Sequence, residues 1–149
     1  MPPKKVSELA DADWELLEIE LDGRCPCSEV LDAAPFHQSA LVDRKLRLLA
    51  AAGVPPNKEK GRYIFENLGK YFLKTKKVRV QLYVLKCKPT PWRLYFYVIP
   101  PASKHQVEFL HAVPKKGWKR DPEDIELCYR LLDRIDQGTA DCRSFHRGP

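Results

Sequence analysis

Basic side chains interleaved with aromatic rings are the residues of this sequence whose types and spacing could do chemistry. Arg93, Tyr95 and Tyr97 alternate along one apolar run, so a strand there would point all three to the same face. Arg79 and Tyr83 occupy the preceding run and are expected beside them. Cations that contact phosphates and rings that stack on unpaired bases suit single-stranded nucleic acid. Tyrosines also fit any half-buried pleated surface, which leaves a purely structural role open.

Further cations lie where the predicted strands end and in the loops that follow, which is where catalytic side chains are often found. This second group consists of six cations and one tryptophan: Lys86, Lys88, Lys115, Lys116, Trp118, Lys119 and Arg120. Two-metal nucleases need several carboxylates, yet the acids of residues 58–120 are only Glu59, Glu66 and Glu108. A metal-free reaction is the alternative, in which the RNA 2′-hydroxyl attacks the adjacent phosphate while cations stabilise the transition state. DNA lacks that hydroxyl, so this chemistry favours RNA.

Charge is segregated along the 149 residues, whose formal net charge is +6. Residues 58–120 carry 16 basic and 3 acidic side chains, whereas the segments on either side are net acidic. A basic centre with acidic flanks predicts a patch that meets a polyanion. A solvated basic face that serves solubility alone is the other interpretation.

Hydrophobic periodicity predicts the elements that position these side chains. Strands are expected at 14–21, 78–85, 92–99 and 106–113, and the short connections between the last three favour an antiparallel meander. Residues 63–73 fit neither the helical period nor the strand period clearly. Helices are expected at 29–33 after an N-cap at Ser28, at 38–52, and from Asp121 until Gly138.

This order predicts an α+β fold with a small antiparallel sheet and helices packed on one face, so that the other face is open to a partner. We expect a single domain over 1–149 with its core at about 14–135. Residues 1–8 and 139–149 are expected to be flexible tails that do not pack on the core.

Several classes of protein are excluded by the composition. No apolar run approaches a membrane span, and the acidic N-terminal residues do not form a secretory signal, so a cytoplasmic protein with no membrane partner is expected. Five cysteines, an odd number, are expected to be reduced thiols. The Cys25-Pro26-Cys27 pair has no second pair to complete a zinc site, so neither a metal nor another cofactor is expected.

Two stretches resemble a known family. LYVLKCKPTPWRLYFYVI (82–99) and VEFLHAVPKKGWKRDPEDIE (107–126), with DGRCPCSEVLDAA (22–34) before them, are similar to the core of the RelE/ParE superfamily of toxins from toxin–antitoxin systems. The resemblance is closest to the HigB-like, phage-derived branch and covers about 14–135 with a gap around 55–76. It implies a RelE-like sheet, ribosome-dependent cleavage of messenger RNA, and neutralisation by a cognate antitoxin.

The resemblance also implies site residues. Arg93 takes the place of the strand arginine that faces the scissile phosphate, Lys86 stands where the branch has arginine, and Lys115 and Lys116 match its lysine pair. His111 matches the branch histidine, although strand alternation leaves a core histidine equally open. Contacts that position RNA are assigned to Lys88, Tyr95, Tyr97, Arg79, Trp118, Lys119 and Arg120. The alternative is a non-catalytic module of the same fold that inhibits gyrase or binds RNA or protein.

Overall fold

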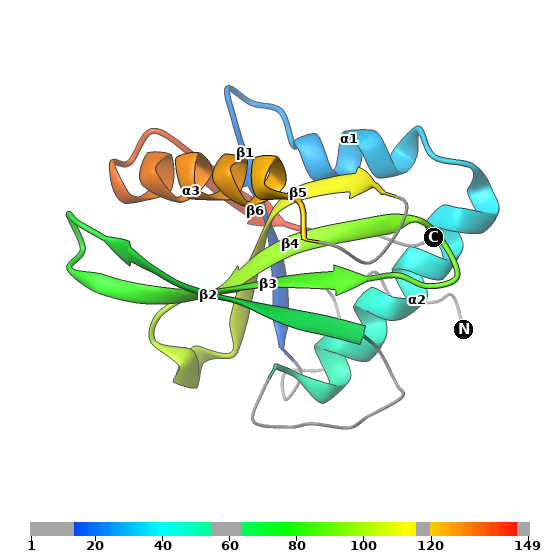
Figure 1. The fold of residues 1–149 in the computed structure, drawn as a ribbon, viewed down its shortest axis with the longest axis horizontal. Coiled ribbons are helices and arrows are strands. Elements are labelled where there is room, and N and C mark those ends of the chain that lie inside the picture. Colours follow the sequence, from blue (N-terminus) through cyan, green and yellow to red (C-terminus); the bar gives the residue numbers. More distant parts are fainter. Residues whose placement is uncertain (1–13, 55–63, 116–119, 146–149) are drawn as a thin grey trace.

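The computed structural model describes residues 14–54, 64–115 and 120–145, which form a six-stranded sheet with three helices (Figure 1). The strand order is β2-β3-β4-β5-β1-β6, in which β1 and β5 are parallel and the other neighbours antiparallel. The strands are β1 (Glu15–Glu20), β2 (Ile64–Leu73), β3 (Val78–Lys86), β4 (Trp92–Val98), β5 (Gln106–Pro114) and β6 (Asp141–Ser144). The helices are α1 (Pro26–Asp32), α2 (Phe36–Ala52) and α3 (Pro122–Asp136), and η2 (Ala102–Lys104) is a short 3-10 turn.

The α+β class and the meander are confirmed, since β3, β4 and β5 pair antiparallel in sequence order. The predicted N-terminal strand is β1, and residues 64–73 of the segment left unassigned form the edge strand β2. The first helix begins earlier than predicted, with Cys25 at its N-cap. Ser28 does not cap it, because its backbone N–H, at 3.1 Å, and its hydroxyl both donate to the buried carboxylate of Glu18.

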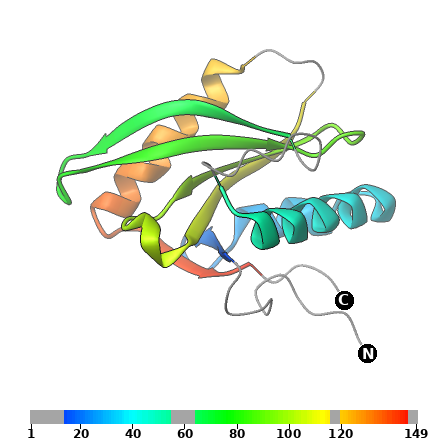
Figure 2. The same ribbon diagram turned by 90° about the horizontal axis from the view of Figure 1, so that it is seen from below.

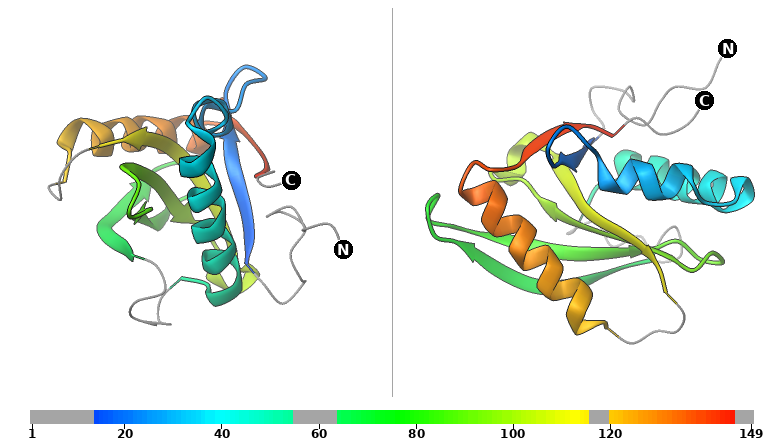
Figure 3. Two further views of the ribbon diagram at one scale, coloured as in Figure 1. Left: turned by 90° about the vertical axis from the view of Figure 1, so that its right-hand side faces the viewer. Right: turned by 90° about the horizontal axis from the view of Figure 1, so that it is seen from above.

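The prediction that helices cover only one face of the sheet is wrong. Helices α1 and α2 pack on one face and α3 packs on the other (Figures 2 and 3). The physical reason lies in β4, where six of seven residues are buried. Its phenol rings bury apolar surface like any aromatic ring, so Tyr95 and Tyr97 form part of the core beneath α3 instead of an open face.

The expectation of a tail from residue 139 is also wrong. Asp141–Ser144 form β6, which pairs antiparallel with β1, and Phe145 is completely buried. A four-residue strand of polar residues carries no hydrophobic period, so the sequence gives little sign of it. The predicted tail segment 1–8 lies outside the described residues.

A buried carboxyl group lies beneath α3. Glu108 on β5 is 2% exposed and accepts a hydrogen bond of 2.7 Å from the Tyr97 hydroxyl. Its Oε2 atom has no hydrogen-bond partner among the residues described. Burial raises the pKa of Glu108 to about 7, against an ordinary value of 4.5.

We expect the free energy of unfolding to decrease as the pH rises from about 4.5 to 7. The folded protein keeps the Glu108 proton over this range, whereas the unfolded chain has lost it, so deprotonation favours unfolding. The loss is about 2–3 kcal/mol, from roughly 1.4 kcal/mol per pKa unit. Glu108→Gln should flatten this decrease, as urea denaturation at pH 5 and pH 8 would measure. If the free energy of unfolding decreased equally between pH 5 and pH 8 in Glu108→Gln, Glu108 would not be the group responsible.

Candidate functional site

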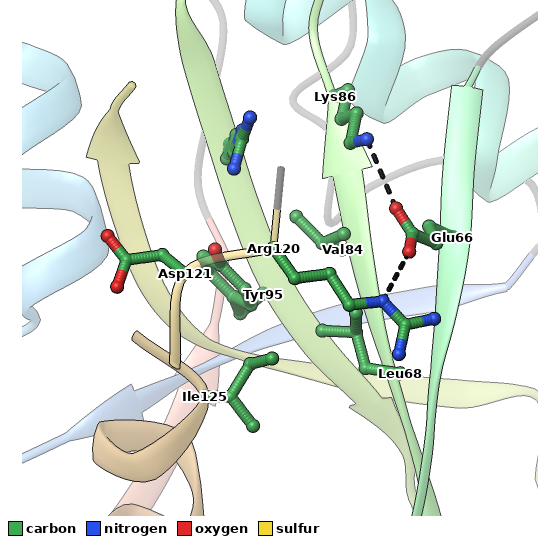
Figure 4. A pocket seen from close by; sticks show the side chains of 9 residues that line it. Glu66, Leu68, Val84, Lys86, Tyr95, Arg120, Asp121 and Ile125 are labelled. Carbon is green, nitrogen blue, oxygen red and sulfur yellow. Dashed lines mark hydrogen bonds and ion pairs between the residues drawn. The ribbon is translucent and has the colours of Figure 1, made fainter. Parts of the chain in front are cut away.

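Three cations from separate segments line one pocket at one end of the sheet (Figure 4), and a fourth, Lys115, lies 2.5 Å from Asp121 of the same pocket. Lys86 at the end of β3 and Arg93 at the start of β4 are cross-strand partners, so both point to the face that α3 covers. Lys115 follows β5, and Arg120 lies just before α3. We call these four residues the cation cluster. Its position past the N-terminal end of α3 leaves it at the margin of the covered face.

Glu66 of β2 connects two members of the cation cluster. Its carboxylate lies 3.1 Å from Lys86 Nζ and 2.6 Å from Arg120 Nε, and Arg120 also donates to the Asn67 carbonyl at 3.0 Å. The hydrogen bond from Arg120, with a further contribution from Lys86, holds the pKa of Glu66 below its ordinary value. A carboxylate held by an arginine and a lysine occupies the kind of position that a phosphate group would take.

A second group of ionic contacts lies at the N-terminus of α3. The ammonium group of Lys115 lies 2.5 Å from Asp121 and 3.5 Å from Asp124. Asp121 is the N-cap, and it also accepts a hydrogen bond from the Glu123 backbone. The hydrogen bond between Lys115 and Asp121 lowers the pKa of the acid and raises that of the amine. Lys115 and Asp121 therefore both stay charged at neutral pH.

His111 lies beside this group, with its Nε2 atom 3.0 Å from Asp124 Oδ1. The register of β5 against β4 shifts between Tyr95 and Phe96, so His111 pairs with Tyr95 while Phe109 pairs with Phe96 on the opposite face. Such a bulge breaks the alternation on which the alternative of a core histidine depended. The side chain of His111 is 22% exposed. Because Asp124 engages Nε2, a proton exchanged with a substrate would pass through Nδ1.

Arg93 is more buried than an RNA-facing residue was expected to be, with 5% of its surface exposed. It lines a pocket with Lys86, Tyr95 and Arg120. The cavity volume there is about 10 Å³, close to the minimum for a single water molecule. Burial and the charge of Asp124 raise the pKa of Tyr95, and a hydrogen bond with Arg93 only partly opposes them. Tyr95 is therefore a neutral hydroxyl at this site and not a base.

The remaining predicted site residues lie in different places. Lys88 lies in the β3–β4 connection, where partial burial and the neighbouring charge of Lys86 lower its pKa. Tyr97 shares a face with Tyr95 but is buried beside Glu108. Arg79 lies on the opposite face of the sheet, because it alternates with Val78 and Val80. Lys116, Trp118 and Lys119 lie outside the described residues.

Sequence reasoning missed the acids of the site. Asp121 and Asp124 were recognised only as the start of a helix, and Glu66 lies in the segment whose period was ambiguous. The signal that could have found them is their position, because Asp121 and Asp124 directly follow the basic segment 58–120.

No family model, curated protein or solved structure matched the chain. Within 14–54, 64–115 and 120–145, no group of three or more histidine, cysteine, aspartate or glutamate side chains is arranged to hold a metal ion. The described helices also include none with the length and apolar character needed to cross a membrane.

Proposed function

We propose that this protein is a ribosome-dependent messenger RNA endonuclease of the RelE/HigB type, which acts in the cytoplasm as the toxin of a toxin–antitoxin pair. The observation that supports this proposal is that Lys86, Arg93 and Arg120 line one pocket with Asp121, and that Lys115 joins Asp121 to the pair formed by Asp124 and His111. Cations gathered near a carboxylate-oriented histidine match the needs of metal-free phosphodiester cleavage.

In this mechanism, an RNA phosphate takes the place of Glu66 and Asp121 on the cation cluster, while Asp124 keeps its contact with His111. Arg93, Lys86 and Lys115 then stabilise the negative charge that builds up on the phosphoryl oxygens. His111 accepts the proton of the ribose 2′-hydroxyl, the bond from that oxygen to phosphorus forms, and the bond from phosphorus to the 5′-oxygen breaks. The products are a 2′,3′-cyclic phosphate and a 5′-hydroxyl, whose oxygen takes its proton from solvent water, and His111 afterwards returns its own proton to solvent.

The ion pairs of the site support a requirement for the ribosome. Glu66 is already paired with Lys86 and Arg120, and Asp121 is already paired with Lys115. RNA must displace these acids, so an unpositioned strand competes poorly, whereas a strand held by the ribosome has already lost its translational freedom. An antitoxin that presents an acidic or amphipathic segment could cover the same cations.

A non-catalytic module of the same fold is the second candidate. It is favoured by the pairing of Lys86, Lys115 and Arg120 with carboxylates and by the cavity of about 10 Å³ beside Arg93. Such a protein would inhibit gyrase, or bind RNA or protein, without cutting. Phosphate contacts alone would make its affinity for RNA fall with salt.

Induction of the gene in bacteria, followed by mapping of transcript ends, separates the two candidates. The endonuclease is expected to produce new 5′-hydroxyl ends within translated regions, in phase with codons, and these ends should also form on programmed ribosomes in vitro. Transcripts that are not translated serve as the internal control. Growth arrest without codon-phased ends would defeat the endonuclease proposal and favour the binding module.

A further inference from the structure

A second basic surface lies at the opposite end of β3 from the cation cluster. Residues 70–79, which form the β2–β3 hairpin, contain five cations and no acid, and we call this segment the basic hairpin. Its cations are Lys70, Lys74, Lys76, Lys77 and Arg79. The nine residues of β3 span about 27 Å, so the basic hairpin is remote from Lys86. It projects from the sheet beside the C-terminal end of α3 (Figure 1).

Helix α3 holds one side of the basic hairpin. Asp136 accepts backbone hydrogen bonds of 2.8 Å from Thr75 and 3.0 Å from Lys76, which fixes the turn. On β2, the Tyr71 hydroxyl donates to Asp133 at 2.7 Å, and its ring also stacks on Tyr129. The hairpin is therefore preorganised before any partner binds, which lowers the entropic cost of binding.

The other side of the basic hairpin carries an exposed aromatic ring between cations. Phe72 and Arg79 are cross-strand partners, and Lys70 lies two residues earlier on the same side of β2. Phe72 is 47% exposed, one of three large hydrophobic residues exposed in the described parts of the chain. Helix α2 lies toward the other end of the sheet and does not cover this side (Figure 2).

We propose that Phe72, Arg79 and Lys70 form a stacking platform for unpaired bases of an RNA strand, distinct from the cation cluster. This inference rests on the proposed RNA substrate and adds a second contact to it. A ring flanked by cations can stack on a base while the cations contact the adjacent phosphates. A segment that is acidic alone would use only the charges, whereas an RNA strand uses the cations for its phosphates and the ring for its bases, so the combination favours RNA.

The test measures the affinity of a fluorescent, unstructured single-stranded RNA at several salt concentrations. Phe72→Thr, which keeps β propensity, should weaken binding about 5- to 100-fold without changing the salt slope. Phe72→Trp should retain the affinity. The double variant Lys70→Gln with Arg79→Gln should reduce the slope of log K against log salt by about 1.4, which corresponds to two phosphate contacts.

Phe36→Thr and Arg44→Gln are the matched controls, because both side chains are exposed on α2. Both controls should bind RNA like the unmodified protein, and all variants should unfold at the same urea midpoint. If Phe72→Thr binds RNA as tightly as Phe36→Thr does, the stacking platform is overturned. The cations of the basic hairpin would then be assigned to binding an acidic protein partner. If Phe72→Thr weakens binding to an RNA duplex as much as it weakens binding to the single strand, base stacking is overturned.

Failure of the platform and failure of the proposed function give different results. Codon-phased cleavage with normal RNA affinity in Phe72→Thr removes the platform and leaves the endonuclease. RNA binding that depends on Phe72, in a protein that never cuts messenger RNA, sustains the platform and removes the endonuclease.

Discussion

Replacement of Arg93 with alanine is expected to lower the rate of messenger RNA cleavage by about 100- to 1,000-fold at saturating substrate, the usual loss when one preorganised donor is removed from a charge-stabilising site. Arg93 is the member of the cation cluster that is buried on the strand and lines the pocket. A buried guanidinium is held in place before the reaction, so its field requires little reorganisation in the transition state. Single-turnover cleavage on programmed ribosomes measures the effect.

Arg93→Lys keeps the charge but loses the planar fork of donors, so we expect an intermediate rate. Arg44→Ala, on α2 and exposed, is the matched control and should cleave normally. Because Arg93 is buried, urea denaturation must first show that each variant is folded at the assay temperature. Full activity in a folded Arg93→Ala protein would remove Arg93 from the site.

Phe145→Ala is expected to reduce the free energy of unfolding by about 3–5 kcal/mol, the typical cost of truncating a buried phenylalanine. The Phe145 ring is completely buried and lies 5.2 Å, centroid to centroid, from the ring of Phe109. Its backbone N–H donates to Leu16 at 3.0 Å, which extends the pairing of β6 with β1. Urea denaturation at pH 7 measures the change.

The control for Phe145 is another phenylalanine with the opposite environment. Phe36 is 85% exposed at the start of α2, so Phe36→Ala should change the free energy of unfolding by less than about 0.5 kcal/mol. Equal urea midpoints for the two alanine variants would mean that residue 145 does not belong to the core.

Local patterns were sufficient to predict most elements. The alternation of 78–85 and 92–99 predicted β3 and β4, and the Asp121-Pro122 start predicted α3. The strand pairing that brings Lys86 opposite Arg93 follows from the short connection between these strands. Half of the cation cluster was therefore predictable from sequence, because its geometry depends on contacts that are close along the chain.

The rest depends on contacts between distant residues. Alternation shows that Arg93, Tyr95 and Tyr97 share a face, but it does not show which helix covers that face. The bulge in β5 that turns His111 toward Asp124 leaves no pattern in the sequence. Glu66 reaches Arg120 only because β2 pairs with β3.

The pairing of β1 has a consequence for synthesis of the chain. Glu15 pairs with Gln106, and Glu20 pairs with Asp141, so both neighbours of β1 are translated long after it. The meander β3–β4–β5 can pair as it emerges, whereas the nascent N-terminal segment keeps Leu16 and Ile19 of β1 without the partners that later bury them. A polypeptide stalled before residue 106 therefore exposes an edge that chaperones would bind.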